Sequence, residues 1–200
     1  MVALHLAGDA DADQLLAEDP FALLVGMLLD QQVRMEAAFA GPRRLLQRLP
    51  GRPSRLDPTA LAGMDPQELA AAMAGPPAVH RYHGSMATRL QALATVVRDT
   101  YDGDATAIWA GAADGADLLR RIRALPGYGE DKAKIFVALL GKQMGVQPDG
   151  WREAAAEYGE DGVHRSAADV VDEESLGRVR DFKQARRAAA KAGSGSGTGT

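Results

Sequence analysis

The 200-residue sequence contains no cysteine. This absence excludes disulfide bridges, a thiolate nucleophile and any iron–sulfur cluster held by cysteine. No stretch approaches the apolar length of a membrane-spanning helix. The N-terminal segment MVALHLAGDADAD also lacks the basic region and the long apolar core of a signal peptide. We therefore expect a cytoplasmic protein that makes no use of a membrane.

Positive charge is concentrated in three places, although the formal net charge is −4. An acidic total does not indicate nucleic-acid binding, which usually involves a basic domain. Local clusters can nevertheless bind a polyanion while acidic residues elsewhere set the sum. For the C-terminal cluster taken alone, a solvated helix face is the better interpretation. The clusters are Arg120, Arg121 and Arg123; Lys132 and Lys134; and Arg178, Arg180, Lys183, Arg186, Arg187 and Lys191.

Residues 125–129, with the sequence LPGYG, separate two segments of helical periodicity. Pro126 fixes φ for a turn, while Gly127 and Gly129 permit positive φ and let another backbone come close. We therefore expect two helices joined by a short hairpin. The apolar residues at helical spacing are Leu118, Leu119 and Ile122 before the turn, and Ala133, Phe136, Val137 and Leu140 after it.

Such a hairpin leaves the first amides of its second helix unpaired. Together with the helix dipole, these amides suit a phosphate group. The alternative is a corner between two helices that has a glycine turn and no ligand.

The chain predicts helices and no convincing strand pairing, so the expected class is all-α. The strongest helix begins after Asp19, which can cap it, with Pro20 in the first turn. Its run FALLVGMLL is apolar nearly all round, which predicts a place in the middle of a bundle. It ends in Asp30, Gln31 and Gln32. The two amides either bond to nearby backbone or solvent, or face a ligand such as a base.

Shorter helices are expected along the rest of the chain. Asp149 is placed to be the N-cap of one of them, at residues 151–158. His80 and His83 are too few to make a metal site. The remaining predicted helices cover residues 11–17, 34–49 with a break near 41–42, 59–62, 67–73, 86–97, about 108–109, 167–171 and 173–192.

Several features together resemble the helix-hairpin-helix DNA glycosylases, which include endonuclease III and the adenine and alkyladenine glycosylases. Residues 125–129 match the L-P-G-x-G motif of this superfamily. Asp149 follows Leu125 by 24 positions, the separation of the catalytic aspartate in endonuclease III. Residues 20–32 are similar to its P-F-x-L-L…Q segment, and residues 81–87 to its G-L/F-Y-x-x-K-A turn. The resemblance covers residues 20–152 and is closest to small actinobacterial-type members with no assigned substrate.

This resemblance implies a fold of two helical lobes. Residues 22–142 would form a six-helix barrel that contains the hairpin. Residues 1–21 and 143–192 would form the second lobe, followed by a flexible tail at residues 193–200. A base turned out of the DNA would lie in the cleft between the lobes. The implied partner is double-stranded DNA with a damaged base, bound by a monomer that associates with the nucleoid.

The resemblance also implies roles for individual residues. Asp149 would stabilise the positive charge that develops on the deoxyribose and would direct a water molecule. Gln32 would fill the space that the everted base leaves, and Tyr82 would act as a wedge between bases. The other implied DNA contacts are Gln31, Gly127, Tyr128, Gly129 and Lys132. Trp151 would line the base pocket, and the carbonyls of Arg123, Leu125 and Tyr128 would bind Na⁺ or K⁺.

The chain departs from the family pattern at the second helix of the motif. Members that also cleave the strand have a lysine at the seventh motif position, where this chain has Asp131. We therefore expect no lyase activity, because Lys132 is turned about 100° away on a helix. Glu130 and Asp131 also place negative charge beside the expected phosphate contact.

Simpler interpretations stay open. Asp149 can be an N-cap alone, Gln32 a helix-end amide, Tyr82 a core aromatic and Trp151 a packing residue. For the whole protein, the alternatives to a monofunctional glycosylase are a non-catalytic protein that binds DNA structures and a helical protein–protein module.

Overall fold

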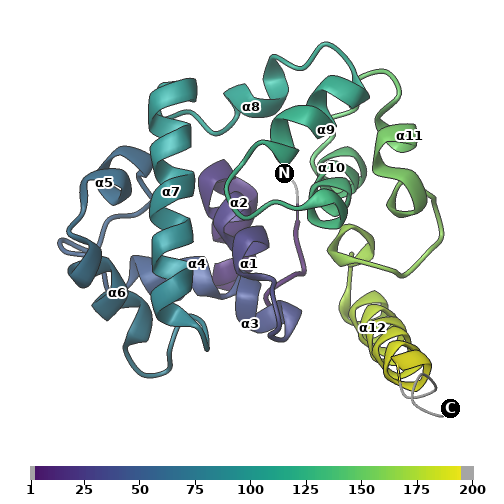
Figure 1. Cartoon of the computed structure of the whole chain (residues 1–200), viewed down its shortest axis with the longest axis horizontal. Helices are drawn as coiled ribbons and strands as arrows, with labels where there is room; N and C mark the ends of the chain where they lie inside the picture. The colour runs from purple at the N-terminus through teal and green to yellow at the C-terminus, as the bar shows by residue number, and fades with distance from the viewer. Residues whose placement is uncertain (1–2, 195–200) are drawn as a thin grey trace, which may run out of the picture.

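The computed structural model describes residues 3–194, with side chains for residues 3–186, 188 and 189. Every regular element in this range is a helix, so the all-α prediction is confirmed (Figure 1). None of the described helices is both long and apolar enough to cross a membrane. The elements are α1 (Ala10–Glu18), α2 (Pro20–Leu29), α3 (Met35–Phe39), α4 (Gly41–Leu46), α5 (Pro58–Gly63), α6 (Pro66–Ala74), α7 (His83–Tyr101), α8 (Ala107–Ala110), α9 (Gly115–Arg123), α10 (Glu130–Gln143), α11 (Trp151–Ala155), the 3₁₀ turns η1 (Ala156–Tyr158) and η2 (Ala167–Asp169), and α12 (Glu173–Ser194).

Helix α2 is the central element (Figure 1). All of residues 21–29 are buried, as expected for a helix that is apolar on every side, and α1, α3 and α4 pack around it. The predicted cap is confirmed. One Asp19 oxygen accepts from the amides of Phe21 (3.0 Å) and Ala22 (3.1 Å), and the other accepts from the amide of Leu56 (2.9 Å). This buried carboxylate therefore starts α2 and holds the loop before α5.

Helix α7 supports α5 and α6, which pack along it at the left of Figure 1. Both short helices begin at the Asp-Pro pairs that predicted them. Asp57 accepts from the Thr59 amide (2.8 Å), and Asp65 accepts from the Gln67 amide (2.8 Å). The face that α7 buries consists of Met86, Ala87, Leu90, Leu93, Ala94 and Val97.

Helices α9 and α10 form the predicted hairpin. Phe136 of α10 is fully buried and contacts two aromatic rings. Its centroid lies 6.2 Å from that of Trp109 and 5.8 Å from that of Tyr128, the latter edge to face. These contacts fix α10 against α8 and against its own hairpin.

The C-terminal part differs from the predicted pattern. The helix predicted at residues 151–158 is α-helical only to Ala155, because Ala156 adopts φ +52° and a 3₁₀ turn follows. The helix predicted at residues 167–171 is the single 3₁₀ turn η2. Helix α12 continues to Ser194, two residues into the predicted tail, and residues 195–200 lie outside the described chain. The division into a six-helix barrel and a second lobe stays a prediction.

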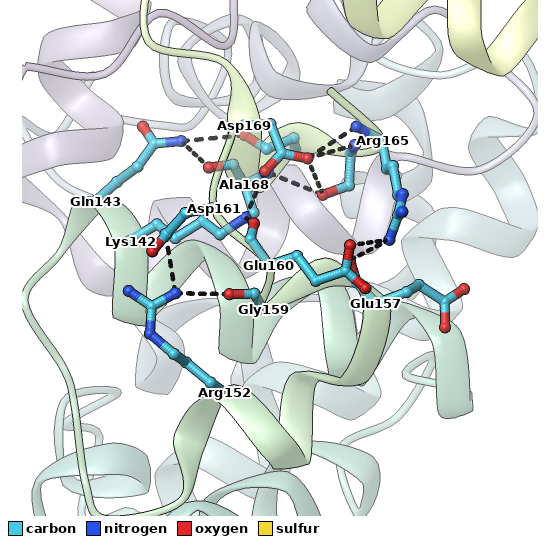
Figure 2. Close-up of polar contacts among 12 residues, drawn as sticks. Lys142, Gln143, Arg152, Glu157, Gly159, Glu160, Asp161, Arg165, Ala168 and Asp169 are labelled. Carbon is cyan, nitrogen blue, oxygen red and sulfur yellow. Dashed lines mark hydrogen bonds and ion pairs between the residues drawn. The ribbon is translucent and has the colours of Figure 1, made fainter. Parts of the chain in front are cut away.

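Polar side chains of α10 hold the C-terminal segment in place (Figure 2). Lys142 Nζ lies 2.6 Å from Asp169 Oδ1, and these side chains are only 12% and 3% exposed. Gln143 Nε2 donates to the carbonyls of Ala167 (3.1 Å) and Ala168 (2.9 Å). The other oxygen of Asp169 accepts from two backbone amides just before η2. The buried ion pair is therefore surrounded by further hydrogen bonds, as a stable buried pair requires.

Candidate nucleic-acid interface

The two glycines of the hairpin serve different purposes. Gly127 has φ +84°, and a Cβ there would lie 2.3 Å from Leu28 Cδ1. The glycine thus allows the hairpin to approach the end of α2. Gly129 has an ordinary φ of −77°, and a Cβ there would meet no atom within 4 Å. Its exposed backbone therefore leaves room for a ligand.

The first turn of α10 presents unpaired backbone donors. Within the described chain, the amides of Gly129, Glu130 and Asp131 find no protein acceptor. Such amides at a helix N-terminus form an anion site. The Glu130 carboxylate lies 2.8 Å from Arg123 Nε and 3.1 Å from Lys134 Nζ. These two cations offset part of the negative charge beside the amides.

The side chain of Tyr128 belongs to the core. It is 4% exposed, and its hydroxyl donates to the Leu24 carbonyl (2.8 Å). Burial raises the pKa of the Tyr128 hydroxyl well above its usual value. The predicted DNA contact of Tyr128 therefore stays a prediction, and only its backbone is available to make it. The carbonyl of Leu125 accepts from the Tyr128 amide (3.1 Å), and cation binding by the carbonyls of Arg123, Leu125 and Tyr128 stays a prediction.

Lys132 connects the start of α10 to the end of α2. Its Nζ donates to the Leu28 carbonyl (2.8 Å). Burial lowers the pKa of Lys132 from 10.5 to about 8. The carboxylate of Asp30 opposes this shift, whereas the charges of Arg89 and Lys183 add to it. Lys132 is therefore a cation in a partly desolvated position.

Gln31 and Gln32 leave the end of α2 in different environments. The Gln31 carbonyl accepts from His80 Nε2 (3.0 Å), and its side-chain oxygen accepts from Arg89. Gln32 is exposed and has φ +57°, a left-handed conformation that is uncommon for a residue with a side chain. Strained residues of this kind often occur at ligand-binding sites. The structure therefore exposes Gln32 to solvent more fully than Gln31.

The turn before α7 presents Tyr82. Its side chain is 44% exposed and lies against the guanidinium of Arg81, 4.7 Å from the ring centroid. The Tyr82 amide donates to His80 Nδ1 (3.0 Å), so Nε2 must carry the hydrogen that is donated to Gln31. Burial lowers the pKa of His80, and the charges of Lys132 and Arg81 lower it further against the opposing bond to Gln31. His80 is therefore a neutral bridge between two exposed turns.

Sequence reasoning assigned no role to His80. Its partner Gln31 is 49 positions away, so no local pattern reveals the bridge. The bonds of His80 to Gln31 and Tyr82, the bond of Lys132 to Leu28 and the close approach of Gly127 to Leu28 bring four groups of residues together at one surface: 31–32, 80–82, 127–129 and Lys132. We call this surface the hairpin corner.

The structure places Asp149 outside the hairpin corner. Its carbonyl accepts from the Gly115 amide (2.7 Å) at the first residue of α9, whereas the hairpin follows the last residue. Nine helical residues span about 13 Å. The N-cap of α11 is Gly150, without any side-chain cap, so the predicted capping role of Asp149 is wrong. Its catalytic role stays a prediction.

Asp149 instead lines a surface groove of about 850 Å³ between α9 and α11, together with Arg123 and Glu153. Trp151 is 7% exposed and does not line this groove. A Cβ on Gly141 would lie 2.3 Å from its ring, which shows how closely the ring packs on α10. The structure therefore supports the packing interpretation of Trp151 rather than a role in a base pocket.

Comparison with known families identifies the fold. A family model described as the HhH-GPD superfamily base excision DNA repair protein matches residues 25–191. The chain belongs to this superfamily. No curated protein and no solved structure matches it. For an HhH-GPD protein, the function is of the DNA glycosylase type, in base excision repair, and the partner is DNA. The match includes the hairpin, both exposed turns of the hairpin corner and most of α12.

Proposed function

We propose that this HhH-GPD protein is a monofunctional DNA N-glycosylase. It would bind damaged double-stranded DNA as a monomer in the cytoplasm, turn the damaged base out of the helix and hydrolyse its N-glycosidic bond. The hairpin corner is the observation that supports this proposal. Exposed amides of α10, Gln32 and Tyr82 come from three distant segments and meet on one surface.

Each part of the hairpin corner has a distinct task. The α10 amides bind a backbone phosphate, which positions the duplex without reading sequence. Turning a base out costs roughly a few kcal/mol of stacking and pairing. Tyr82 offsets this cost as a wedge between bases, and Gln32 offsets it by bonding to the base left unpaired. His80 bonds to the Gln31 carbonyl and to the Tyr82 amide, and so holds the Gln32 and Tyr82 turns in a fixed relative position.

Hydrolysis of the bond builds positive charge on the deoxyribose, as in other glycosidic cleavages. A carboxylate beside the sugar stabilises this charge and accepts a proton from the attacking water. Lyase chemistry would instead require a neutral amine that attacks the sugar. Asp131 stands at the motif position that supplies such an amine, and Lys132 donates its ammonium hydrogen to Leu28.

Borohydride reduction of the protein with lesion-bearing DNA tests the absence of a lyase step. We expect base release and no covalent protein–DNA product. A trapped product that disappears in Lys132→Ala would assign the lyase step to Lys132 and would overturn the monofunctional proposal.

Gly129→Ala tests the phosphate contact. The added methyl group meets no protein atom, so the melting temperature should not change. It would nevertheless stand where a phosphate approaches the amides, and DNA affinity should fall about tenfold, the loss of one charge-assisted hydrogen bond. Gly63→Ala is the matched control, because its Cβ also meets no protein atom and lies on α5. Equal DNA affinity for both variants would remove the hairpin from the interface.

A non-catalytic protein that binds DNA structures is the second candidate, and the position of Asp149 favours it. A panel of duplexes with uracil, alkylated purines or oxidised bases separates the two candidates. Base release from any duplex supports the enzyme, whereas tight binding to distorted duplexes with no release supports the binder.

A further inference from the structure

Asp30 is a largely buried carboxylate at the hairpin corner. It is the C-cap of α2 and immediately precedes Gln31 and Gln32. Its side chain is 14% exposed, and its Oδ2 lies 3.3 Å from Lys183 Nζ of α12. Its charge also acts on Lys132 of α10. Asp30 therefore stands between α2, α10 and α12.

Other carboxylates of this region are less well placed. Glu130 is paired with Arg123 and Lys134 on the flank of the hairpin. Asp131 is exposed in the first turn of α10, where its negative charge repels a phosphate. Asp149 lies at the opposite end of α9. Asp30, in contrast, is close in the chain to the residue that would replace the everted base.

On the basis of the proposed glycosylase function, we infer that Asp30 is its catalytic carboxylate and that Lys183 covers it until DNA binds. The bond between C1′ and the base nitrogen breaks, and its electron pair leaves with the base. Asp30 stabilises the cation at C1′, and a water oxygen then bonds to C1′. The proton that the water loses passes through the Asp30 carboxylate to the departing base. The products are an abasic site and the free base.

In the ion pair between Asp30 and Lys183, a DNA phosphate can take the place of the Asp30 carboxylate. The 3.3 Å separation of the pair and the 30% exposure of Lys183 describe a long contact whose cation is partly solvated. The nearby groove between residues 33–36 and α12 is also lined by Arg180 and Lys183. A DNA phosphate in this region can replace Asp30 as the partner of Lys183. DNA binding then uncovers the carboxylate where the sugar arrives.

Two abasic duplexes test the inference without knowledge of the excised base. One carries a neutral tetrahydrofuran in place of a nucleoside, and the other carries a pyrrolidine, which is cationic at neutral pH and imitates the charged sugar. Mimics of a transition state bind tighter than neutral analogues. The full-length protein should therefore bind the pyrrolidine duplex at least tenfold tighter than the tetrahydrofuran duplex.

Asp30→Asn should reduce this ratio to about one and leave affinity for the tetrahydrofuran duplex nearly unchanged. Asp149→Asn, the matched control, should keep the ratio, and Lys183→Met should raise it, because the carboxylate loses its competing partner. Asp30→Ser provides a second variant if Asp30→Asn does not fold.

A ratio that is kept in both Asp30 variants, or lost in Asp149→Asn, would overturn the assignment of Asp30. Failure of the underlying function looks different, because it appears in the wild type: the wild-type protein would then bind the two abasic duplexes equally, as a non-catalytic binder would, or bind neither better than an intact duplex.

Discussion

Replacing Lys132 by methionine should stabilise the protein at neutral pH while weakening its affinity for DNA. Methionine keeps the length of the side chain and removes the buried charge. Burial lowers the pKa of Lys132 from 10.5 to about 8, so the folded protein holds this ammonium at an energetic cost. A functional cation that reduces stability is a common compromise at binding sites.

The magnitude follows from the pKa shift. At 1.36 kcal/mol per pKa unit, the shift of Lys132 corresponds to about 3 kcal/mol. Methionine also removes the hydrogen bond to Leu28, and the loss of that bond costs about 1 kcal/mol. The net gain is about 2 kcal/mol at pH 7, which corresponds to a rise in melting temperature of about 4–8 °C for a protein of this size.

The pH dependence gives a second, independent readout. Because the folded-state pKa of Lys132 is lowered, the unfolded chain binds more protons between pH 8 and 10.5, and the stability of the wild type rises through this window. The advantage of Lys132→Met should therefore be constant below pH 8, shrink from pH 8 to 10.5 and end as a small deficit.

Urea unfolding of both proteins at several pH values measures this advantage. Lys134→Met is the control, because Lys134 lies on the same helix in an ion pair with a half-exposed Glu130 and should change stability by less than about 0.5 kcal/mol. A variant less stable than the wild type at pH 7, or an advantage that does not change between pH 8 and 10.5, would refute the reasoning. In DNA titrations, Lys132→Met should reduce the salt dependence of binding by about one unit of slope.

Three further outcomes are expected from single replacements. Gln32→Gly should raise the free energy of unfolding by about 1 kcal/mol, because glycine adopts the observed φ of +57° without strain, and should weaken binding to abasic DNA; a loss of stability would contradict this. His80→Phe keeps an aromatic ring but breaks both hydrogen bonds of the bridge, so it should destabilise the fold by about 2 kcal/mol. It should also weaken binding to abasic DNA by more than the fraction of unfolded protein at the assay temperature accounts for. Unchanged binding would remove His80 from any positioning role. Asp169→Asn leaves Lys142 as an unpaired buried charge and should cost about 3–5 kcal/mol in chemical unfolding, whereas a change below 1 kcal/mol would show that the pair is dispensable.

Local signals in the sequence were sufficient for most of the helices. Asp19, Asp57 and Asp65 each precede a proline, and each caps the helix predicted there. The burial of α2 followed from its composition, and the hairpin followed from its proline and two glycines. These features depend on residues within a few positions of one another, so one sequence contains the whole signal.

The arrangement of the site depended on distant contacts. The separation of Leu125 and Asp149 in the sequence fixes the length of chain between them, but not the direction in which that chain runs. The segment turns away where the Asp149 carbonyl meets Gly115 and where Gly150 adopts φ +75°. The bridge through His80 was not predictable for the same reason, since its partner belongs to another segment. Likewise, the motif allows any residue at the position of Tyr128, so it does not predict that the Tyr128 ring enters the core.

The rigidity of α2 determines which partner must deform during recognition. Its nine consecutive buried residues are held by the Asp19 cap at one end and by the Lys132 hydrogen bond at the other, so the backbone that leads to Gln31 and Gln32 is fixed in place. It is therefore the DNA duplex that must change its conformation when the two bind. Base pairs that open easily, because they are mismatched or chemically damaged, would thus be selected by their low cost of opening, before the base itself is bound in any pocket.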